Sequence, residues 1–428
     1  MESLKSLNSF SQIKKLVGFG EGIKVAYKTP EEEDQFVRFD MEVFDKVQST
    51  FWKKAPDADL ADLYHLALAK AGSTTPETVV LPTKDRAGTA KMLGVAMGPL
   101  SNESRKKLAL DTAIIVLYNL PPSGRNGLLS AKDETVLREN VSNIDRSRDL
   151  YKDLGIEKGA TSEKVEQAYL DKKTELSKLN TPEAKQELAK VDYAREVLTK
   201  PEAKTLYDQN QIEPTVFPRV IGGKTLYLYI NKISPTTLQE FGMAIVNAST
   251  TSGLNSMILD LRSNIGGSLD FAQYFLGAFL GQNQYAFDLF HKEDYQVQRT
   301  VLAKASELDR YKETAILTDN MTQSTAELIT AVFKRFKLAR VVGMPTRGWG
   351  TVENTYPIET IIDPAEKYSL LLVHSLTLRD DNQPIEGRGV DPDVYTDKKD
   401  WQNELGKYFH ITDLVNAVSK TAGQAPMK

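Results

Sequence analysis

The chain has 428 residues, a formal net charge of -4, 41% apolar residues and 26% charged residues. This composition is ordinary for a globular protein, and the length suggests roughly two to four domains. The weak charge gives no reason to expect nucleic acid or an anionic membrane as the main partner. Cysteine is absent, which excludes disulfides, thiolate metal sites and cysteine nucleophiles. The 4 histidines are scattered without metal-ligand spacing, so we expect no metal and no cofactor.

Residues 1–34 are mixed in character and end in an acidic run, so we interpret them as a lead-in segment. Their apolar stretches are short and interrupted by lysine and glycine, which makes a poor signal peptide. No part of the sequence approaches the ~20 consecutive apolar residues that span a bilayer. The sequence therefore predicts a cytoplasmic protein without a transmembrane segment.

Two helical units are expected before residue 214. In the first, over residues 35–147, apolar residues repeat at helical spacing from Phe36 to Phe51. Ser130 has the character of a helix N-cap. The second unit, over residues 148–210, is rich in lysine and glutamate, with Thr181 as a cap and Pro182 in the first helical position.

The sequence pattern changes over residues 214–428. Short β-branched runs alternate with helical patterns there, and the region ends in a helical tail. Alternating strands and helices indicate an α/β layer with crossover connections. The expected strands are Lys224–Ile233, Ser256–Leu261, Ala315–Leu317, Ala339–Val342 and Tyr368–Leu378, and the expected helices are Thr236–Ala248, Leu269–Leu280 and Thr325–Phe336.

The first segment with chemical potential is a strand that ends in Asp260-Leu-Arg262 and turns through Gly266 and Gly267 into a helix. Glycines permit a tight turn, and their N–H groups together with the helix start suit a developing oxyanion. A plain turn with an ion pair between Asp260 and Arg262 explains the same residues about equally well.

The second segment places Ser324 where a strand and loop lead into a helix, a position that presents a nucleophile at the end of a sheet. Taken alone, the pattern favours a simple helix cap, because Ser324 and Glu327 have capping-box spacing. A third segment, residues 341–353, is a strand followed by a glycine-rich turn, and it is uninformative by itself.

In this order the three segments resemble the core of the C-terminal-processing (tail-specific) serine peptidases, which implies a crotonase-like fold. A fourth segment, Gly387–Val394, resembles the closing motif of that family. The resemblance covers residues 220–396, and Phe39–Gly72 and Leu120–Asn143 resemble its preceding helical domain. The implied fold class is α/β (α+β), with a ββα peptidase core behind a helical domain.

The resemblance assigns Ser324 as the nucleophile and the N–H groups of Thr325, Gly266 and Gly267 as the oxyanion hole. Asp260 and Arg262 would support the turn. The family's general base is a lysine, but Trp349 occupies its position, and Glu353 occupies that of a glutamine which orients the lysine.

The indole of Trp349 accepts no proton, and Arg347 remains protonated, so neither replaces the lysine. Glu353 is a candidate base if burial raises its pKa. His374 is a second candidate, because distant relatives use histidine, although a lone histidine on a strand is more often structural.

Where the family usually has a PDZ domain, residues 148–210 instead resemble a J-domain, through Tyr151–Ile156, Val165–Tyr169, Ala194–Leu198 and Leu206–Asp208. The His-Pro-Asp tripeptide that stimulates the partner chaperone is replaced by Ser177-Lys-Leu179. A generic charged helical hairpin is the alternative interpretation of this region.

Three functions follow from the sequence. The first is a serine endopeptidase that cleaves unfolded or C-terminal segments of a polypeptide substrate. The second is a pseudopeptidase that binds extended peptides by strand addition without cutting them. The third is an adaptor that contacts a chaperone through residues 148–210.

Overall fold

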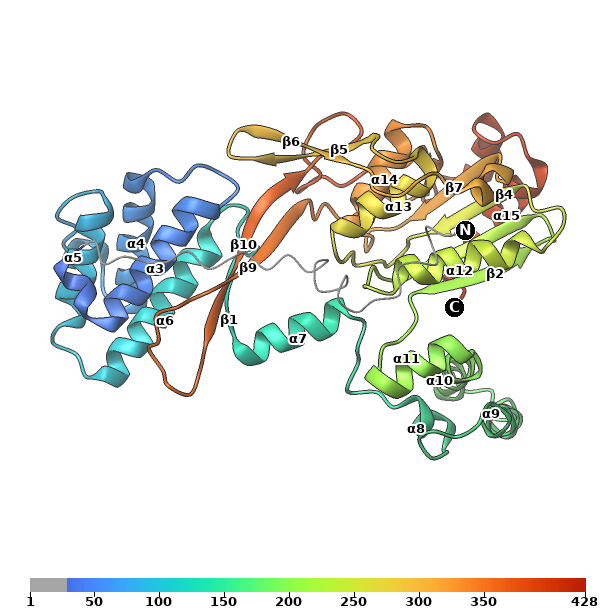
Figure 1. Ribbon diagram of the computed structural model, residues 1–428, viewed down its shortest axis with the longest axis horizontal. Coiled ribbons are helices and arrows are strands. Elements are labelled where there is room, and N and C mark those ends of the chain that lie inside the picture. Colours follow the sequence, from blue (N-terminus) through green and yellow to red (C-terminus); the bar gives the residue numbers. More distant parts are fainter. Residues whose placement is uncertain (1–28) are drawn as a thin grey trace.

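The computed structural model describes residues 29–428, and it has the predicted mixed α/β architecture. A helical domain lies at one end of an elongated molecule, and a larger α/β core lies at the other (Figure 1). Most of the lead-in predicted over residues 1–34 falls outside the described residues. Four short 3-10 helices complete the elements discussed below: η1 (Pro30–Glu33), η2 (Pro76–Thr78), η3 (Ser306–Arg310) and η4 (Trp401–Lys407).

The N-terminal domain is helical, as predicted, although α5 falls where the sequence analysis placed no helix, and side-chain caps fix several helix starts. Asp34, Asp85 and Ser101 each accept a hydrogen bond from a backbone N–H in the first turn of the helix that follows, which satisfies an N–H group that the helix cannot pair. The helices are α3 (Gln35–Thr50), α4 (Asp57–Ala71), α5 (Arg86–Met97) and α6 (Asn102–Asn119).

A five-stranded sheet joins this helical domain to the second half of the chain. Its strands are β1 (Gly127–Ser130), β10 (Tyr368–Thr377), β5 (Tyr285–His291) and β6 (Asp294–Arg299) in that order, with β9 (Thr351–Pro357) paired to β10. Leu370, Leu372 and Val373 of β10 share one apolar core with α3 to α6. The helical domain therefore completes its core with residues far away in the sequence.

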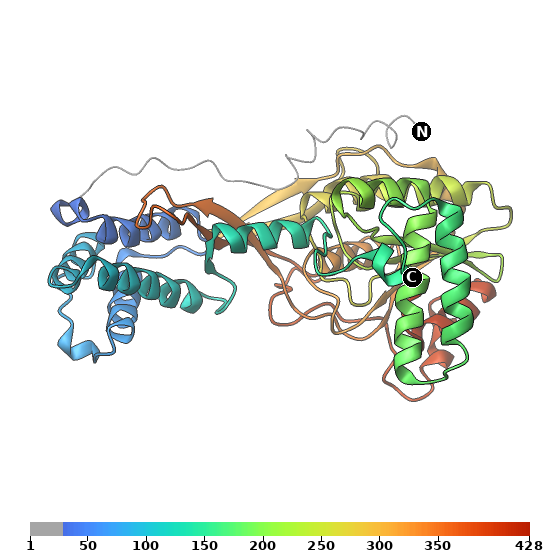
Figure 2. The same cartoon turned by 90° about the horizontal axis from the view of Figure 1, so that it is seen from below.

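Helix α7 (Ala131–Val141) leads from this sheet to a unit of four helices (Figure 2). The predicted cap at Ser130 is confirmed, as are Thr181 as a cap and Pro182 at the start of its helix. The four helices are α8 (Leu150–Leu154), α9 (Ser162–Leu176), α10 (Pro182–Thr199) and α11 (Pro201–Asn210). Residues 177–179, at the point of the missing tripeptide, lie in the turn between α9 and α10. The J-domain resemblance itself stays a prediction.

The core contains a six-stranded sheet in the order β11 (Val394–Tyr395), β8 (Arg340–Gly343), β7 (Glu313–Thr318), β4 (Ser256–Asp260), β3 (Thr225–Ile230) and β2 (Val216–Ile221). All neighbours are parallel except β2, which pairs antiparallel with β3. The strands predicted at Lys224, Ser256, Ala315 and Ala339 are confirmed with small shifts at their ends.

Alternating side chains cover the two faces of this sheet, as expected for a strand buried on both sides. Leu226, Leu228 and Ile230 face a core formed with α12 (Thr237–Ser249), α13 (Asp270–Leu280) and α14 (Thr325–Arg335). Tyr227 and Tyr229 face the opposite core, which contains α15 (Thr412–Ala422), η4 and residues of the four-helix unit. Since β4 and β7 are parallel, the loops that follow them meet at one edge of the sheet.

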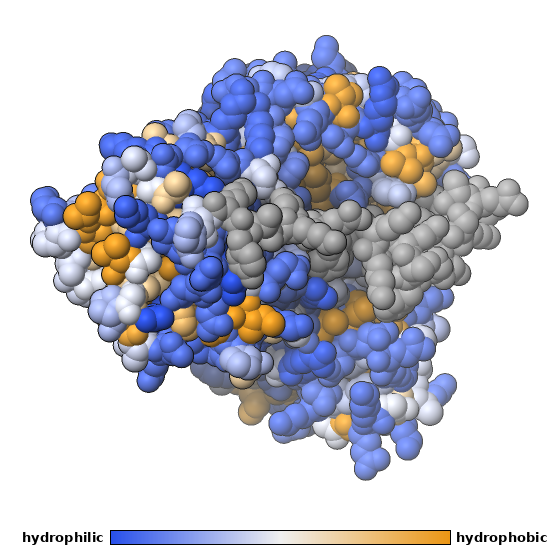
Figure 3. Space-filling view, turned by 60° about the vertical axis from the view of Figure 1, so that its left-hand side comes forward, coloured by the Kyte–Doolittle hydropathy of each residue, from blue (hydrophilic) through white to orange (hydrophobic). Residues whose placement is uncertain are grey.

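The surface seen in Figure 3 is mainly hydrophilic, with hydrophobic residues in separate patches. Each helix within residues 29–428 is too short or too polar to cross a membrane.

Candidate active site

Ser324 occupies the junction between the loop after β7 and helix α14, as predicted. Its backbone has φ 57° and ψ -129°, a conformation that L-residues rarely adopt and that is usually retained at functional sites. A helix cap ordinarily has extended backbone angles. Ser324 and Glu327 have the predicted capping-box arrangement, in which the Glu327 carboxylate accepts from the N–H of Ser324 at 2.8 Å. Capping alone therefore does not account for this backbone.

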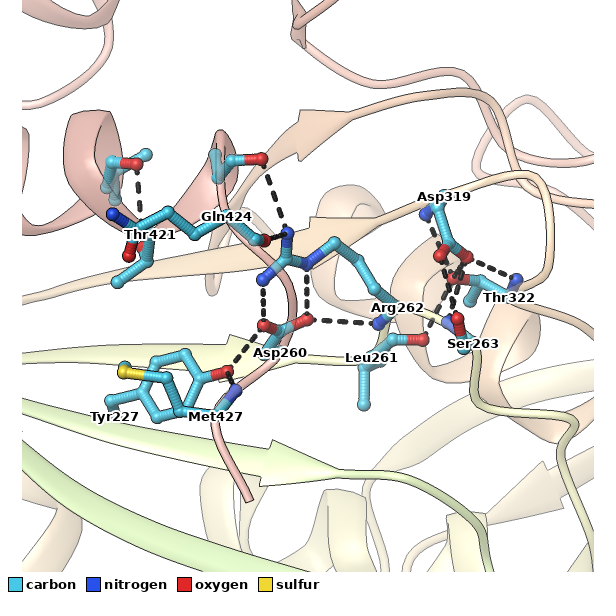
Figure 4. A network of polar contacts seen from close by, with 12 residues as sticks. Tyr227, Asp260, Leu261, Arg262, Ser263, Asp319, Thr322, Thr421, Gln424 and Met427 are labelled. Atoms are coloured by element: carbon cyan, nitrogen blue, oxygen red, sulfur yellow. Dashed lines mark hydrogen bonds and ion pairs between the residues drawn. The ribbon is translucent and has the colours of Figure 1, made fainter. Parts of the chain in front are cut away.

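The loop that carries Ser324 is tied to the loop after β4 by a polar network (Figure 4). One carboxylate oxygen of Asp319 accepts hydrogen bonds from the N–H groups of Ser263 and Thr322, both at 2.9 Å. The Thr322 hydroxyl donates to the carbonyl oxygen of Leu261 at 2.9 Å. These bonds hold the two loops in a fixed relation before any substrate binds.

The Asp260–Arg262 pair, predicted as supporting, is a buried ion pair with Nη2 and Oδ2 2.5 Å apart. Tyr227 donates to Asp260 at 2.7 Å. Arg262 also donates to the carbonyl oxygen of Gln424 (Figure 4). The pair thus holds the segment after α15 against the end of β4. Its effect on the candidate nucleophile is indirect, through the loops after β4 and β7.

The two glycines of the turn are required by close contacts. A Cβ atom at Gly266 would lie 2.6 Å from the Cβ of Ser324, and one at Gly267 would lie 1.7 Å from the carbonyl oxygen of Ile233. Both residues also have positive φ, 82° and 152°. Any side chain here would displace the turn from Ser324.

The structure distinguishes between the three N–H groups predicted to form the oxyanion hole. The N–H of Gly266 donates to the Asn264 side chain at 2.8 Å, so it is already engaged. Among residues 29–428, the N–H groups of Gly267 and Thr325 have no hydrogen-bond acceptor. The Thr325 hydroxyl donates to the carbonyl oxygen of Gly267 at 2.8 Å and so links these two residues. Gly267 and Thr325 are the donors left for an oxyanion.

Glu327, noted in the sequence only for its capping spacing, joins the nucleophile to the glycine-rich turn after β8. Its buried carboxylate accepts from the N–H of Ser324 at 2.8 Å, the Thr346 hydroxyl at 2.5 Å, and the N–H groups of Gly348 and Trp349 at 2.7 and 2.8 Å. Burial raises the pKa of Glu327, and these bonds act in the opposite direction. The four donors account for a fully buried acidic side chain.

Trp349, which the resemblance aligns with the family lysine, is held from two sides. Its indole N–H donates to Glu353 at 3.1 Å, and the guanidinium of Arg125 lies 3.5 Å from the ring centroid. Arg125 in turn donates to Glu386 at 2.9 Å. Arg347 lies farther from the ring, at 5.7 Å. Arg125 comes from the N-terminal domain, and no local sequence pattern connects it with Trp349.

Neither predicted base is hydrogen-bonded to Ser324 among the described residues. Glu353 accepts from Thr351 and Trp349, and burial raises its pKa. His374 shares a hydrogen bond of 2.7 Å with the Ser375 hydroxyl and stacks on His291 with the ring centroids 4.3 Å apart. Burial lowers the pKa of His374 to about 4. Their roles as bases therefore stay predictions.

Comparison with known proteins gives one family. Residues 224–396 match the sequence model described as peptidase family S41. Proteins named "Probable CtpA-like serine protease" are similar to this chain. The one from Staphylococcus saprophyticus subsp. saprophyticus is 28% identical over 177 residues, which cover 41% of this chain and 34% of the relative. The one from Staphylococcus aureus strain COL is 29% identical over 184 residues, covering 42% and 35%. The chain thus spans about a third of the length of these relatives.

Solved structures with a related fold include a photosystem II D1 C-terminal processing protease, with a TM-score of 0.37 and 15% identity over 50% of this chain and 53% of that protein. A lipoprotein from Streptococcus agalactiae has a TM-score of 0.45 and 12% identity, over 90% and 98% of the two chains. The match to peptidase family S41 rests on the sequence comparisons alone. Residues 224–396 thus match peptidase family S41, in agreement with the family that the sequence motifs resemble.

Proposed function

We propose that the protein is a serine-type endopeptidase that cleaves unfolded or C-terminal segments of polypeptides. The observation that carries this proposal is the strained Ser324 beside the unengaged N–H groups of Gly267 and Thr325. The serine oxygen would attack the carbonyl carbon of the scissile bond, and the two N–H groups would receive the negative charge of the tetrahedral intermediate. Water would then release the acyl group from the serine.

An unfolded substrate is supported by the apolar side chains next to this site. Ile265, in the turn that carries Gly266, is 44% exposed, and Met321, in the loop that carries Ser324, is 45% exposed. Two large apolar side chains left in water suit contact with the apolar side chains of an unfolded segment. The relatives named "Probable CtpA-like serine protease" support the serine protease activity.

A second candidate function is peptide binding without cleavage. It is favoured by Trp349, which fills the position of the family lysine and is fixed by Arg125 and Glu353. Strand β9 pairs only with β10 among the described residues, and so it has a free edge on which an extended peptide could add as a strand.

The test is cleavage of a permanently unfolded protein, followed by mass spectrometry of the products. We expect the wild type to cleave it and Ser324→Ala to lose at least about 1000-fold in rate, as for removal of a catalytic nucleophile. Ser306→Ala, at an exposed serine of η3, is the control and should retain full activity. Identical products from wild type and Ser324→Ala would refute the proposal. Binding of the substrate without any turnover would establish the second candidate.

A further inference from the structure

Lys232 is a half-buried lysine between β3 and α12 with no interaction partner for its charge. Among residues 29–428, no carboxylate forms an ion pair with it, and its ammonium makes no hydrogen bond. Leaving an ammonium partly desolvated and unpaired is unfavourable, so such groups are uncommon unless they have a function. The sequence gives no pattern that distinguishes Lys232 from the other lysines.

The backbone next to Lys232 is bonded to the oxyanion turn. The N–H of Ile233 donates to the carbonyl oxygen of Gly266 at 2.9 Å, and Ile233 forms an isolated β-bridge with Gly267. Gly266 in turn contacts Ser324 so closely that a Cβ atom has no room between them. One glycine therefore separates the segment after β3, which carries Lys232, from the candidate nucleophile.

The Lys232 side chain points away from the apolar core that buries its neighbour Ile233. Ile233 is fully buried in the core shared with α12 to α14. Successive side chains of an extended segment point in opposite directions, so Lys232 lies outside that core, at the edge of the sheet where the loops after β4 and β7 meet.

The acidic groups on the neighbouring elements are engaged elsewhere. Glu240 of α12 accepts from Thr236 and from the N–H groups of Thr215 and Val216. Asp319 of the nucleophile loop accepts from the loop after β4. Burial is the one cause that lowers the pKa of Lys232, and a lower pKa increases the fraction of neutral amine near pH 7.

We propose that the amine of Lys232 is the general base for Ser324, in place of the lysine that Trp349 has replaced. The inference rests on the proposed peptidase function. The lone pair of the amine takes the hydroxyl proton while the serine oxygen bonds to the scissile carbonyl carbon. The resulting ammonium donates this proton to the leaving nitrogen as the C–N bond breaks, and the neutral amine then activates the water that hydrolyses the acyl-enzyme.

The first test is the pH profile of kcat/KM for three variants. Lys232→Met, which keeps the length and loses the amine, should lose on the order of 100–10,000-fold. Lys232→Arg should be equally impaired, because a guanidinium stays protonated. Lys224→Met, at an exposed lysine in the turn before β3, is the control and should match the wild type. The wild-type rate should rise with pH as the amine loses its proton, and this rise should be absent from the residual rate of Lys232→Met.

A second test distinguishes a chemical role from a structural one. Ethylamine added to Lys232→Ala should restore part of the rate in proportion to its neutral form, and it should not restore Ser324→Ala. If Ser324→Ala is inactive while Lys232→Met retains wild-type kcat/KM, the proposal for Lys232 is wrong and the peptidase function stands. If the wild type itself cleaves nothing, both proposals are overturned.

Discussion

Two turns at the same edge of the six-stranded sheet differ in the chemistry they retain. The turn with Gly266 and Gly267 is packed on Ser324, and the N–H groups of Gly267 and of the neighbouring Thr325 stay unengaged. The turn after β8 carries Trp349, whose ring packs against Arg125 at the position that the resemblance assigns to the base. The Glu327 carboxylate accepts from the N–H groups of Ser324 and Trp349, so it joins the residue on which the first turn packs to the second turn. The backbone arrangement around Ser324 thus does not depend on which residue acts as the general base.

The largest expected effect is on the first turn. Gly267→Ala would place a Cβ atom 1.7 Å from the Ile233 carbonyl oxygen, so the turn must move and its N–H must leave the oxyanion position. We expect kcat/KM to fall on the order of 100–1000-fold, as for loss of one oxyanion donor. Gly406→Ala, where no atom lies within 4 Å of the added carbon, is the control. Full activity of Gly267→Ala would show that this turn has no part in catalysis.

The connection between Ser324 and the turn after β8 is tested by Glu327→Gln. The amide replaces one acceptor oxygen by an NH₂ group that faces N–H donors, so buried groups lose their partners. We expect the free energy of unfolding to fall by about 3 kcal/mol, measured by urea denaturation. The exposed Glu404→Gln should leave it unchanged. Equal stability of the two variants would mean that Glu327 does not hold Ser324 to the turn after β8.

A smaller effect concerns His374, which the sequence offered as a base. Its pKa is lowered by burial to about 4, whereas an unfolded histidine has its ordinary value near 6.5. The contribution to stability is complete above pH 6.5 and is lost as the pH falls toward 4, because the unfolded chain then binds the proton first. With allowance for partial exposure, we expect a loss of about 1–2 kcal/mol between these values.

The measurement compares the pH dependence of unfolding in His374→Gln and in the exposed His410→Gln. The first variant should lose this slope between pH 6.5 and 4, and the second should keep it. If His374→Gln instead abolishes cleavage at pH 7 with the slope unchanged, His374 belongs to the catalytic site.

The smallest effect is the coupling between Arg125 and Trp349. A double-mutant cycle with Arg125→Met and Trp349→Leu should give about 1 kcal/mol of coupling in unfolding free energy, as for a partly buried cation–π pair. Activity of Trp349→Leu should stay within about 10-fold of the wild type, since the indole transfers no proton. A stable Trp349→Leu variant without activity would contradict the view that the turn after β8 takes no part in proton transfer.

The strands and the position of Ser324 were predictable because their signals are local. The apolar runs at Ser256 and Ala315, with glycines or a serine behind them, predict parallel strands whose loops meet. The family resemblance added the identity of the turn, and the sequence match over residues 224–396 confirms the family.

The partners of these residues were not predictable, because they come from segments that are distant in the sequence and meet only in the folded chain. No spacing rule connects Arg125 to Trp349 or β10 to the helices of the N-terminal domain. Nor does the sequence indicate that Asn264 engages the N–H of Gly266 and leaves those of Gly267 and Thr325. Such details depend on distances of a few tenths of an ångström.

The most direct test of the central claim is covalent labelling of Ser324. The intact protein is incubated with a fluorophosphonate, and the adduct is located by peptide mass spectrometry. We predict a single adduct on Ser324 that is absent from Ser324→Ala and retained in Trp349→Leu. No adduct on the wild type, or one on another serine with Ser324 unmodified, would contradict the claim that this edge of the sheet holds a working nucleophile.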